Sequence, residues 1–405
     1  MVRNIVVLGG NSHPQLVDNI CNILGVPHCN RILTKFSGGE TRCEIQDSVR
    51  GKDVYIIQTG SGHVNDHLIE LCIMISACKI GSAKRITAVI PLFPYSRQPD
   101  VPYKKAGAPS SKLNRAYTFD SVPPTPAAGP SKSFGDASNR LNGIESLGDR
   151  LGSTKISEIP DGDETEAPLP MNNINGFQAR PGYKQWIAQA GTLVADLLTC
   201  SGADHVISVE LHDPQYQGFL DCPFDNLYGK PTLQRYIKES IPEWREAVIV
   251  SPDAGGAKRA TAIADALCLD FSLIHKVKMS FGCSSTAFPK LTSDSLQERR
   301  PTKFSERSID DIVDTANTIT RAAKLLKKEG ALKIYALLTH GVMSGDALSR
   351  INRSPIDKMV VTNSVPQDEH RRLCPKLEVL DISHILAEAI RRSHHGESIS
   401  VLFQY

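Results

Sequence analysis

Residues 308–319 read Ser-Ile-Asp-Asp-Ile-Val-Asp-Thr-Ala-Asn-Thr-Ile, which places three carboxylates beside a turn of small and hydroxyl-bearing residues. A helical pattern of apolar residues follows at once: Ile319, Ala322, Ala323, Leu325 and Leu326. Paired carboxylates at the end of a strand can accept hydrogen bonds from the two vicinal hydroxyls of a ribose. A small-residue turn that enters a helix presents backbone N–H groups and the positive end of the helix dipole, which favour a phosphate. The stretch therefore predicts a site for a pentose phosphate.

The alternation of strand and helix extends through most of the chain. Apolar runs predict strands at 4–8, 54–57, 86–90, 205–209, 247–251, 271–274, 333–338 and 358–362. Apolar residues at helical spacing predict helices at 67–79, 187–197, 258–267 and 385–393. This rhythm indicates an α/β fold with mainly parallel sheets flanked by helices. Because 405 residues are too many for one ordinary core, we expect two domains.

The rhythm stops near Gly107, and residues 108–181 are rich in Ser, Pro, Gly and Asn. Such a segment cannot bury enough apolar surface to fold, so we predict a disordered insertion. Residues 1–107 and 182–230 would then form an N-terminal α/β domain, and 231–405 a C-terminal one. We expect residues 385–405 to pack back on the N-terminal domain.

The composition is that of a soluble globular protein, with 40% hydrophobic and 22% charged residues and a formal net charge of +2. So small a net charge gives no general signal for nucleic acid or membrane binding. No apolar run approaches the ~20 residues of a membrane span. The ten cysteines form no Cys-x-x-Cys pair, and the chain enters a strand-like run without a signal-peptide pattern. We expect a cytoplasmic protein with reduced cysteines.

Polar residues gather where the predicted strands end, and open α/β sheets bind ligands at this edge. Glu210 and His212 follow the strand at 205–209, and Lys276 follows the strand at 271–274. Residues 251–259, Ser-Pro-Asp-Ala-Gly-Gly-Ala-Lys-Arg, offer the carboxylate of Asp253, two glycines that admit a phosphate, and two cations. His212 and Asp253 together can bind Mg²⁺ with bridging phosphate oxygens. Taken alone, His212 is better explained as a structural histidine, whereas Asp253 is equally compatible with a turn residue or a helix cap.

The N-terminal half contains two further candidate segments. Residues 33–40, Leu-Thr-Lys-Phe-Ser-Gly-Gly-Glu, include Phe36, which can stack on a base, and Glu40, which can accept from an exocyclic amine. Residues 91–98, Pro-Leu-Phe-Pro-Tyr-Ser-Arg-Gln, include Arg97, which can clamp a polyphosphate. Taken alone, core packing explains Phe36 equally well, and a surface ion pair explains Arg97.

Together these segments resemble the ribose-phosphate pyrophosphokinases (phosphoribosyl pyrophosphate synthetases). Matches in the family's order run from Gly-Gly-Asn-Ser-His-Pro at 9–14 to Glu-Ser-Ile-Ser-Val-Leu-Phe at 397–403. The most specific is Glu-Leu-His-Asp-Pro-Gln-Tyr-Gln-Gly-Phe at 210–219, similar to the signature in which a metal-binding histidine precedes Gln-Gly-Phe. The chain resembles the eukaryotic type of this family, which has an inserted segment. The resemblance implies two similar phosphoribosyltransferase-like domains.

The resemblance also implies a reaction. The β,γ-diphosphoryl group of ATP passes to the C1 hydroxyl of ribose 5-phosphate, giving phosphoribosyl pyrophosphate for nucleotide biosynthesis, and AMP. Such transfers depend on positioning and charge neutralisation more than on covalent catalysis. Mg²⁺ is the implied cofactor. Dimers that build to hexamers, from identical or paralogous subunits, are the implied assembly.

Roles for single residues follow from the resemblance. For ATP binding it implies Phe36, Gly38, Glu40, Arg97, Gln98 and Asp100, with Phe36 and Glu40 often acting across a subunit boundary. For the metal it implies His212, Asp253 and Glu210. For catalysis it implies Lys276, Lys278 and Arg97. For ribose 5-phosphate it implies Asp310, Asp311, Asp314, Thr315, Ala316, Asn317 and Thr318. For a regulatory phosphate it implies Ser48 and Arg50.

The chain departs from the family's pattern at several of these positions. Gly38 stands in place of Asn, Pro99 intervenes before Asp100, and Lys278 replaces an arginine. Asn317 replaces the glycine of the phosphate loop, and Asn tolerates positive φ better than most residues. Residues 304–309, Phe-Ser-Glu-Arg-Ser-Ile, are expected to be too polar for a central strand.

These departures leave an alternative open. The chain can be a catalytically weak or inactive regulatory subunit in a hetero-oligomer with active paralogues. His212, Asp253, Lys276 and the acidic stretch at 310–314 are intact, and they favour the enzyme.

Overall fold

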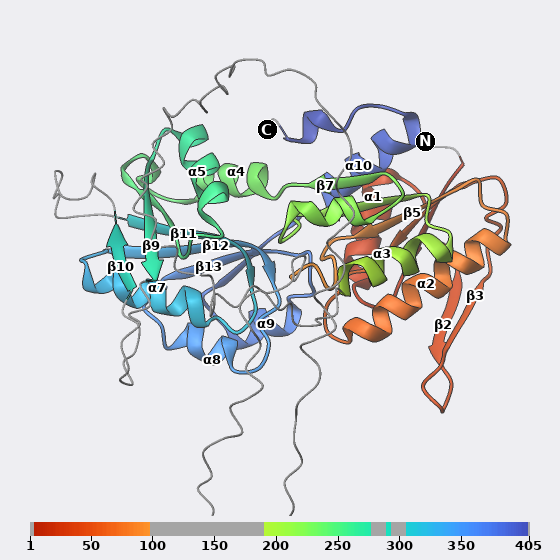
Figure 1. Cartoon of the computed structure of the whole chain (residues 1–405), viewed down its shortest axis with the longest axis horizontal. Helices are drawn as coiled ribbons and strands as arrows, with labels where there is room; N and C mark the ends of the chain where they lie inside the picture. Colours follow the sequence, from red (N-terminus) through yellow and green to blue (C-terminus); the bar gives the residue numbers. More distant parts are fainter. Residues whose placement is uncertain (1–3, 98–189, 277–288, 293–304, 404–405) are drawn as a thin grey trace, which may run out of the picture. The chain divides into compact units, whose positions relative to one another are not determined.

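The computed structural model describes residues 4–97, 190–276, 289–292 and 305–403 (Figure 1). For residues 275, 276, 289–292 and 305–307 the description covers the backbone alone. The predicted insertion at 108–181 lies outside the described residues.

The first sheet is parallel throughout and has the strand order β1-β4-β5-β6-β7. Its strands are β1 (Ile5–Gly9), β4 (Asp53–Ile57), β5 (Arg85–Ile90), β6 (His205–Val209) and β7 (Phe224–Leu227). Parallel strands with helices on both faces are buried on both sides, which explains their nearly continuous apolar runs.

Side chains that alternate along β4 show how this sheet forms the middle of three layers. Val54 and Ile56 belong to a buried cluster with α2 (Val64–Ile80) and α3 (Ala190–Ser201). Tyr55 and Ile57 point to the opposite face and pack with α1 (Pro14–Leu24) and α10 (Ser383–His395). A hairpin of β2 (Arg31–Lys35) and β3 (Thr41–Ile45) forms a separate two-stranded sheet.

The second sheet has the order β10-β9-β8-β11-β12-β13-β14, in which β10 pairs antiparallel with β9 and the other pairs are parallel. Its strands are β8 (Val248–Ser251), β9 (Asp270–Lys276), β10 (Pro289–Thr292), β11 (Ser305–Val313), β12 (Lys333–Gly341), β13 (Lys358–Thr362) and β14 (Leu377–Leu380).

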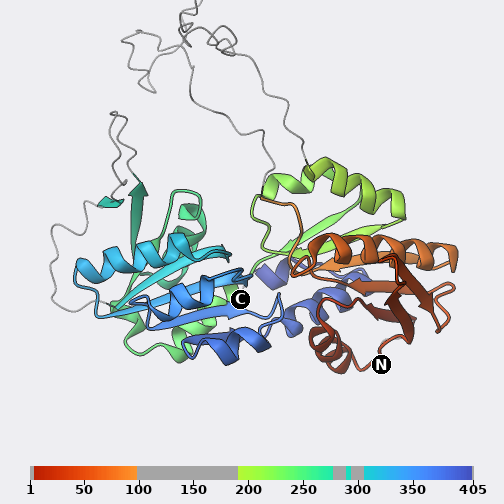
Figure 2. The same ribbon diagram turned by 90° about the horizontal axis from the view of Figure 1, so that it is seen from below.

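Helices cover both faces of the second sheet as well (Figure 2). One face packs against α4 (Lys230–Ser240) and α5 (Ala257–Leu267), and the other against α7 (Asn317–Lys328) and α8 (Ala347–Asn352). The remaining elements are α9 (Asp368–Leu373) and the 3-10 helices η2 (Pro214–Phe219), η3 (Trp244–Glu246) and η4 (Ser400–Phe403). The predicted fold class, two α/β domains with mainly parallel sheets, is confirmed.

The expectation that residues 304–309 are too polar for a central strand is wrong. Residues 305–309 belong to β11, which lies between β8 and β12 and pairs with both. Ser308 is opposite Val250 on one side and Ala336 on the other, and Ile309 is fully buried. The neighbouring strands supply the apolar burial, so β11 can carry polar residues. Asp310 and Asp311 consequently belong to the strand itself.

The chain returns to the first sheet through α10, which follows β14 of the second sheet and packs against α1. His394 on α10 lies 2.7 Å from the carboxylate of Asp53 at the start of β4. Arg85 donates to the carbonyl and the hydroxyl of Ser393. Among the described residues, no helix is both long and apolar enough to cross a membrane.

Candidate active site

A cavity of about 720 Å³ lies where the carboxyl ends of strands from both sheets meet. The first sheet contributes residues 60–62 after β4, 92–97 after β5 and 210–212 after β6. The second sheet contributes Asp311, Ile312 and Asp314 from β11 and the turn that follows it, with His340 and residues 342–344 from β12 and its loop. Parallel strands end at one edge of a sheet, so these segments converge although they are distant in sequence.

The end of β6 is fixed by His340 from the other sheet. Glu210 adopts a left-handed backbone (φ 47°), which turns the chain out of the strand. The Nε2–H of His340 donates to the carbonyl of Val209 at 3.0 Å, and Nδ1 accepts from the hydroxyl of Ser364 at 2.8 Å. Burial lowers the pKa of His340 to about 4, so the ring is neutral and can fill both roles.

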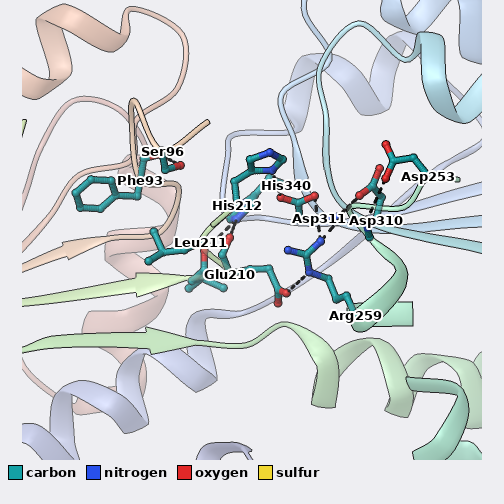
Figure 3. Close-up of polar contacts among 12 residues, drawn as sticks. Phe93, Ser96, Glu210, Leu211, His212, Asp253, Arg259, Asp310, Asp311 and His340 are labelled. Atoms are coloured by element: carbon teal, nitrogen blue, oxygen red, sulfur yellow. Dashed lines mark hydrogen bonds and ion pairs between the residues drawn. The ribbon is translucent and has the colours of Figure 1, made fainter. Parts of the chain in front are cut away.

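His212 and Asp311 form the closest polar contact in this part of the cavity. The Nδ1–H of His212 donates to Oδ2 of Asp311 at 2.6 Å, which leaves Nε2 available to a ligand (Figure 3). This hydrogen bond raises the pKa of His212 above its usual value. Burial alone would raise the pKa of Asp311, but the hydrogen bond from His212 and the charge of Arg259 lower it well below its usual range.

Arg259, on the first turn of α5, lies among three carboxylates. Its Nε donates to Oε1 of Glu210 at 2.7 Å, and its Nη1 lies 3.2 Å from Asp311 and 4.0 Å from Asp310. The other oxygen of Glu210 accepts from the backbone N–H of Gly229 at 2.9 Å. The metal role of Glu210 stays a prediction; this buried carboxylate already accepts one hydrogen bond on each oxygen, from Arg259 and from Gly229.

Asp310 differs in protonation from its neighbour. Burial, together with the adjacent Asp311 and the charge of Asp253, raises the pKa of Asp310 to about 8. Near neutral pH this carboxyl holds a proton while Asp311 is ionised. Asp311 thus lines the cavity as an ionised carboxylate, with the protonated Asp310 next to it in β11.

Asp253 lies in the turn between β8 and α5. Its Oδ1 accepts from the N–H of Gly256 at 3.1 Å, and Ser251 donates to its carbonyl at 2.7 Å. A Cβ at Gly256 would lie 3.1 Å from the Ser251 hydroxyl and 3.4 Å from Asp310 Oδ1. The glycine therefore lets this turn lie directly against β11.

The turn from Asp314 to Thr318 enters α7. The carboxylate of Asp314 accepts from Arg97 at 2.6 Å and also from the hydroxyl of Ser344. Arg350 on α8 donates to the carbonyl of Thr315 at 2.8 Å. The expected positive φ lies at Ala316 (φ 58°) rather than at Asn317, which is the first residue of α7. This corrects the sequence-based interpretation of Asn317.

Comparison with known proteins now identifies the family. The N-terminal domain of ribose phosphate pyrophosphokinase matches residues 5–113, and the phosphoribosyl synthetase-associated domain matches residues 306–404. Ribose-phosphate pyrophosphokinase 5 of Schizosaccharomyces pombe is 47% identical over 405 residues, which is 100% of this chain and 98% of that protein. The chain belongs to the ribose-phosphate pyrophosphokinase family.

A solved structure supports this assignment. The phosphoribosylpyrophosphate synthetase from Mycobacterium smegmatis is similar with a TM-score of 0.71 and 28% sequence identity. The similarity covers 97% of this chain and 100% of that one. The resemblance drawn from the sequence is therefore confirmed over both pyrophosphokinase-like domains.

The structure brings some residues with implied pyrophosphokinase roles together and leaves others apart. Arg97, His212, Asp311 and Asp314 line the cavity, with Asp253 and Asp310 beside them. Phe36, Gly38 and Glu40 lie instead at the β2–β3 hairpin, where Phe36 donates its N–H to the carbonyl of Glu40 at 2.8 Å. The side chain of Phe36 is 53% exposed, and none of the three lines the cavity.

Other residues with predicted roles lie away from the cavity or outside the described residues. Ser48 and Arg50 are exposed in the connection between β3 and β4. Lys276 is the last residue of β9, and only its backbone is described. Gln98, Asp100 and Lys278 lie outside the described residues.

Sequence reasoning gave no site role to His340, Ser344 or Arg350, and it noted Arg259 only as one of two cations at the start of a helix. Arg259 had one available signal, since it lies four residues before Ile263 on the buried face of α5. A cation on such a face needs a buried partner. The partner is 49 residues away in sequence, so the pair is evident only in three dimensions.

Proposed function

We propose that this chain is an active ribose-phosphate diphosphokinase. It transfers the β,γ-diphosphoryl group of ATP to the C1 hydroxyl of ribose 5-phosphate. The observation that carries the proposal is the convergence of Arg97, His212 and Asp311 at one cavity, in a chain of this family. The reaction needs two anionic substrates brought together, and this cavity has one sheet on each side to hold them.

The sugar lies on the side of the second sheet. Asp310 has a pKa of about 8, so near neutral pH its carboxyl can both donate to and accept from ribose hydroxyls. The backbone N–H groups at the start of α7, from Asp314 to Thr318, receive the 5-phosphate. Asp311 was predicted to contact the sugar, but one of its oxygens binds His212 and the other lies beside Arg259. We assign it mainly to holding His212.

ATP lies on the side of the first sheet. Arg97 is a cavity residue with a half-exposed side chain, suited to a polyphosphate. Gln98 and Asp100 follow it in sequence and complete this part of the site in the proposal. Lys276 is the last residue of β9. In the proposal its ammonium group, together with that of Lys278, stabilises the negative charge that develops on the transferring group.

Mg²⁺ fits the donor set found here. Asp311 orients His212 through Nδ1, the usual way in which a carboxylate prepares the opposite ring nitrogen for a metal. Within the described residues, no three His, Cys, Asp or Glu side chains are grouped to hold a metal ion by themselves. Mg²⁺ commonly binds one or two protein groups together with substrate phosphates and water. His212 and Asp253 would hold it, and when bound it would neutralise charge on the phosphates.

The adenine pocket is completed by a second subunit in this proposal. Phe36 and Glu40 are exposed on a hairpin and do not line the cavity of their own chain. An assembly of identical or paralogous subunits in the cytoplasm would present this hairpin to a neighbour's cavity. The dimers and hexamers implied by the family resemblance are consistent with such an exchange.

One assay tests the function directly. We expect the purified chain, given ATP, ribose 5-phosphate and Mg²⁺, to release AMP and phosphoribosyl pyrophosphate. Lys276→Ala should abolish most of the turnover while ribose 5-phosphate binding, measured by calorimetry, is retained. Lys79→Ala, on the outer end of α2, is the matched control and should leave turnover unchanged. Binding of the sugar without any turnover would support the regulatory-subunit alternative.

A further inference from the structure

Among the described residues, Arg259 forms ion pairs with carboxylates from both sheets, and His212 after β6 also pairs with Asp311 of β11. Glu210 lies directly after β6 of the first sheet, whereas Asp310 and Asp311 belong to β11 of the second (Figure 3). The guanidinium lies between them, with Nε directed to Glu210 and Nη1 to Asp311. Its side chain is 21% exposed, compared with 4% for both Glu210 and Asp311.

These contacts argue against a direct role for Arg259 in binding a phosphate. Its position near the glycine turn at 251–256 would suit that role from sequence alone. The structure instead directs the guanidinium at buried carboxylates, which hold it strongly. Burial would lower the pKa of Arg259, but the charges of Asp311 and Glu210 raise it, so the group stays positively charged.

The positive charge of Arg259 stabilises the buried carboxylates around it. Burial raises the pKa of Glu210, and the charge of Arg259 and the hydrogen bond from Gly229 oppose that rise. Asp311 is ionised and almost fully buried. Arg259 is the one cation in the described part of the chain that pairs with both Glu210 and Asp311, and removing it from these buried carboxylates would be costly.

We propose that Arg259, fixed by Glu210, is a positioning residue for ribose 5-phosphate binding and for the His212 metal site. The inference rests on the proposed function. Arg259 holds one oxygen of Asp311, which directs the other oxygen to Nδ1 of His212. The positive charge of the same guanidinium offsets the negative charge of Asp311 near Asp310. The carboxyl of Asp310 therefore remains available to the sugar. Glu210 acts through Arg259 and touches neither substrate.

A specific prediction distinguishes positioning from general stabilisation. Arg97, which binds nucleotide in the proposed function, lies on a different loop and pairs with Asp314 rather than with Arg259 or Glu210. Loss of Arg259 should therefore weaken sugar binding and metal binding more than it weakens binding of metal-free ATP. A purely structural role would weaken all three together.

The experiment compares Arg259→Gln and Arg259→Lys with the unaltered protein. Calorimetry measures ribose 5-phosphate and metal-free ATP, and electron paramagnetic resonance measures Mn²⁺ as the metal probe. For Arg259→Gln we expect at least about tenfold weaker binding of sugar and Mn²⁺, with ATP binding changed less than about twofold. Arg259→Lys restores the charge without the planar fork and should recover part of both losses.

Arg392→Gln is the matched control. Arg392 donates its Nε to Glu388 at 2.7 Å and is 20% exposed, close to the values for Arg259, but it lies on α10 away from the cavity. We expect its sugar and Mn²⁺ affinities to equal those of the unaltered protein. Glu210→Gln provides a second variant if Arg259→Gln does not fold, and the same selective loss is expected.

The outcomes separate the two proposals. If the unaltered protein binds no ribose 5-phosphate, the proposed function fails. If it binds the sugar and both the Arg259→Gln and Glu210→Gln variants bind equally well, the positioning role is wrong and the function stands. Equal losses for sugar, Mn²⁺ and ATP, without rescue by lysine, would also overturn the positioning role.

Discussion

Arg97 and Asp314 form a 2.6 Å ion pair across the cavity, one from the loop after β5 and the other from the turn after β11. In the proposed function these residues serve different substrates, ATP and ribose 5-phosphate. Without ligands each therefore neutralises the other. A ligand that takes Arg97 leaves Asp314 unpaired, so the two substrate sites share one local interaction.

Breaking this pair should change nucleotide affinity. Asp314→Asn frees Arg97, so we expect tighter binding of metal-free ATP in the absence of sugar. The pair is partly exposed, and exposed ion pairs contribute about 0.2–1 kcal/mol, so the gain is at most about fivefold. Calorimetry measures it. Asp346→Asn, which removes an exposed carboxylate beside Arg350, is the control. Unchanged or weaker ATP binding in Asp314→Asn would contradict this coupling.

Replacement by alanine should change the stability of the protein differently at Gly191 and at Gly218. A Cβ at Gly191 would lie 2.8 Å from the buried ring of Tyr216, whereas nothing lies within 4 Å of a Cβ at Gly218. We expect Gly191→Ala to lower the free energy of unfolding by about 1–3 kcal/mol, because overpacking outweighs the gain in helix propensity. Gly218→Ala should stay within about 0.5 kcal/mol. Urea unfolding measures the free energy of unfolding of both variants. Equal losses of stability would show that Tyr216 can move away from a methyl group at position 191.

The phosphate turn offers a paired test at Ala316 and Asn317. Ala316 has positive φ, which costs a residue with a Cβ about 1–2 kcal/mol, whereas Asn317 starts a helix. Ala316→Gly should therefore be at least about 1 kcal/mol more stable than Asn317→Gly, since glycine weakens a helix. Thermal unfolding of the two variants measures the difference. The reverse order would place the positive φ at 317.

Acid should destabilise the protein in part through His340. Its pKa in the folded protein is about 4, below the ordinary value of 6.5, so the unfolded chain binds the proton first as the pH falls. Stability from this group is complete above about pH 6.5 and decreases towards pH 4. Between pH 7 and pH 5 the loss is about 2 kcal/mol.

Comparison with His340→Gln checks this expectation. Glutamine does not titrate, so the variant should be less stable at pH 7 but should lose less stability on acidification to pH 5. Urea unfolding at both pH values gives the difference in slope. Identical slopes in the two proteins would assign the acid sensitivity to other groups.

The apolar runs explain why much of the fold was predictable. Strands such as β4 and β6 are buried on both faces, so their residues alone indicate a parallel sheet. β11 was not predictable in this way, because its position between two apolar strands makes a polar sequence acceptable. Strand β3 alternates half-buried and exposed residues, and β2 has one buried residue, so both give a weaker signal than the buried runs.

The site was only partly predictable, for a related reason. Residue types at strand ends pointed to His212, Asp253 and the acids of β11, since such ends converge in this class of fold. Their pairings depend on residues far away in sequence. The pairing of Glu210 with Arg259 joins residues that are 49 positions apart. The pairing of Arg97 with Asp314 likewise spans 217 residues.

The return of α10 to the first sheet has a consequence for synthesis on the ribosome. Tyr55 and Ile57 are made early, yet the face that carries them is covered partly by Leu386 and Ile390. Until those late residues emerge, an apolar surface stays open on the nascent chain, and such surfaces promote aggregation. Chaperone demand during translation should therefore persist until the last helix has been released.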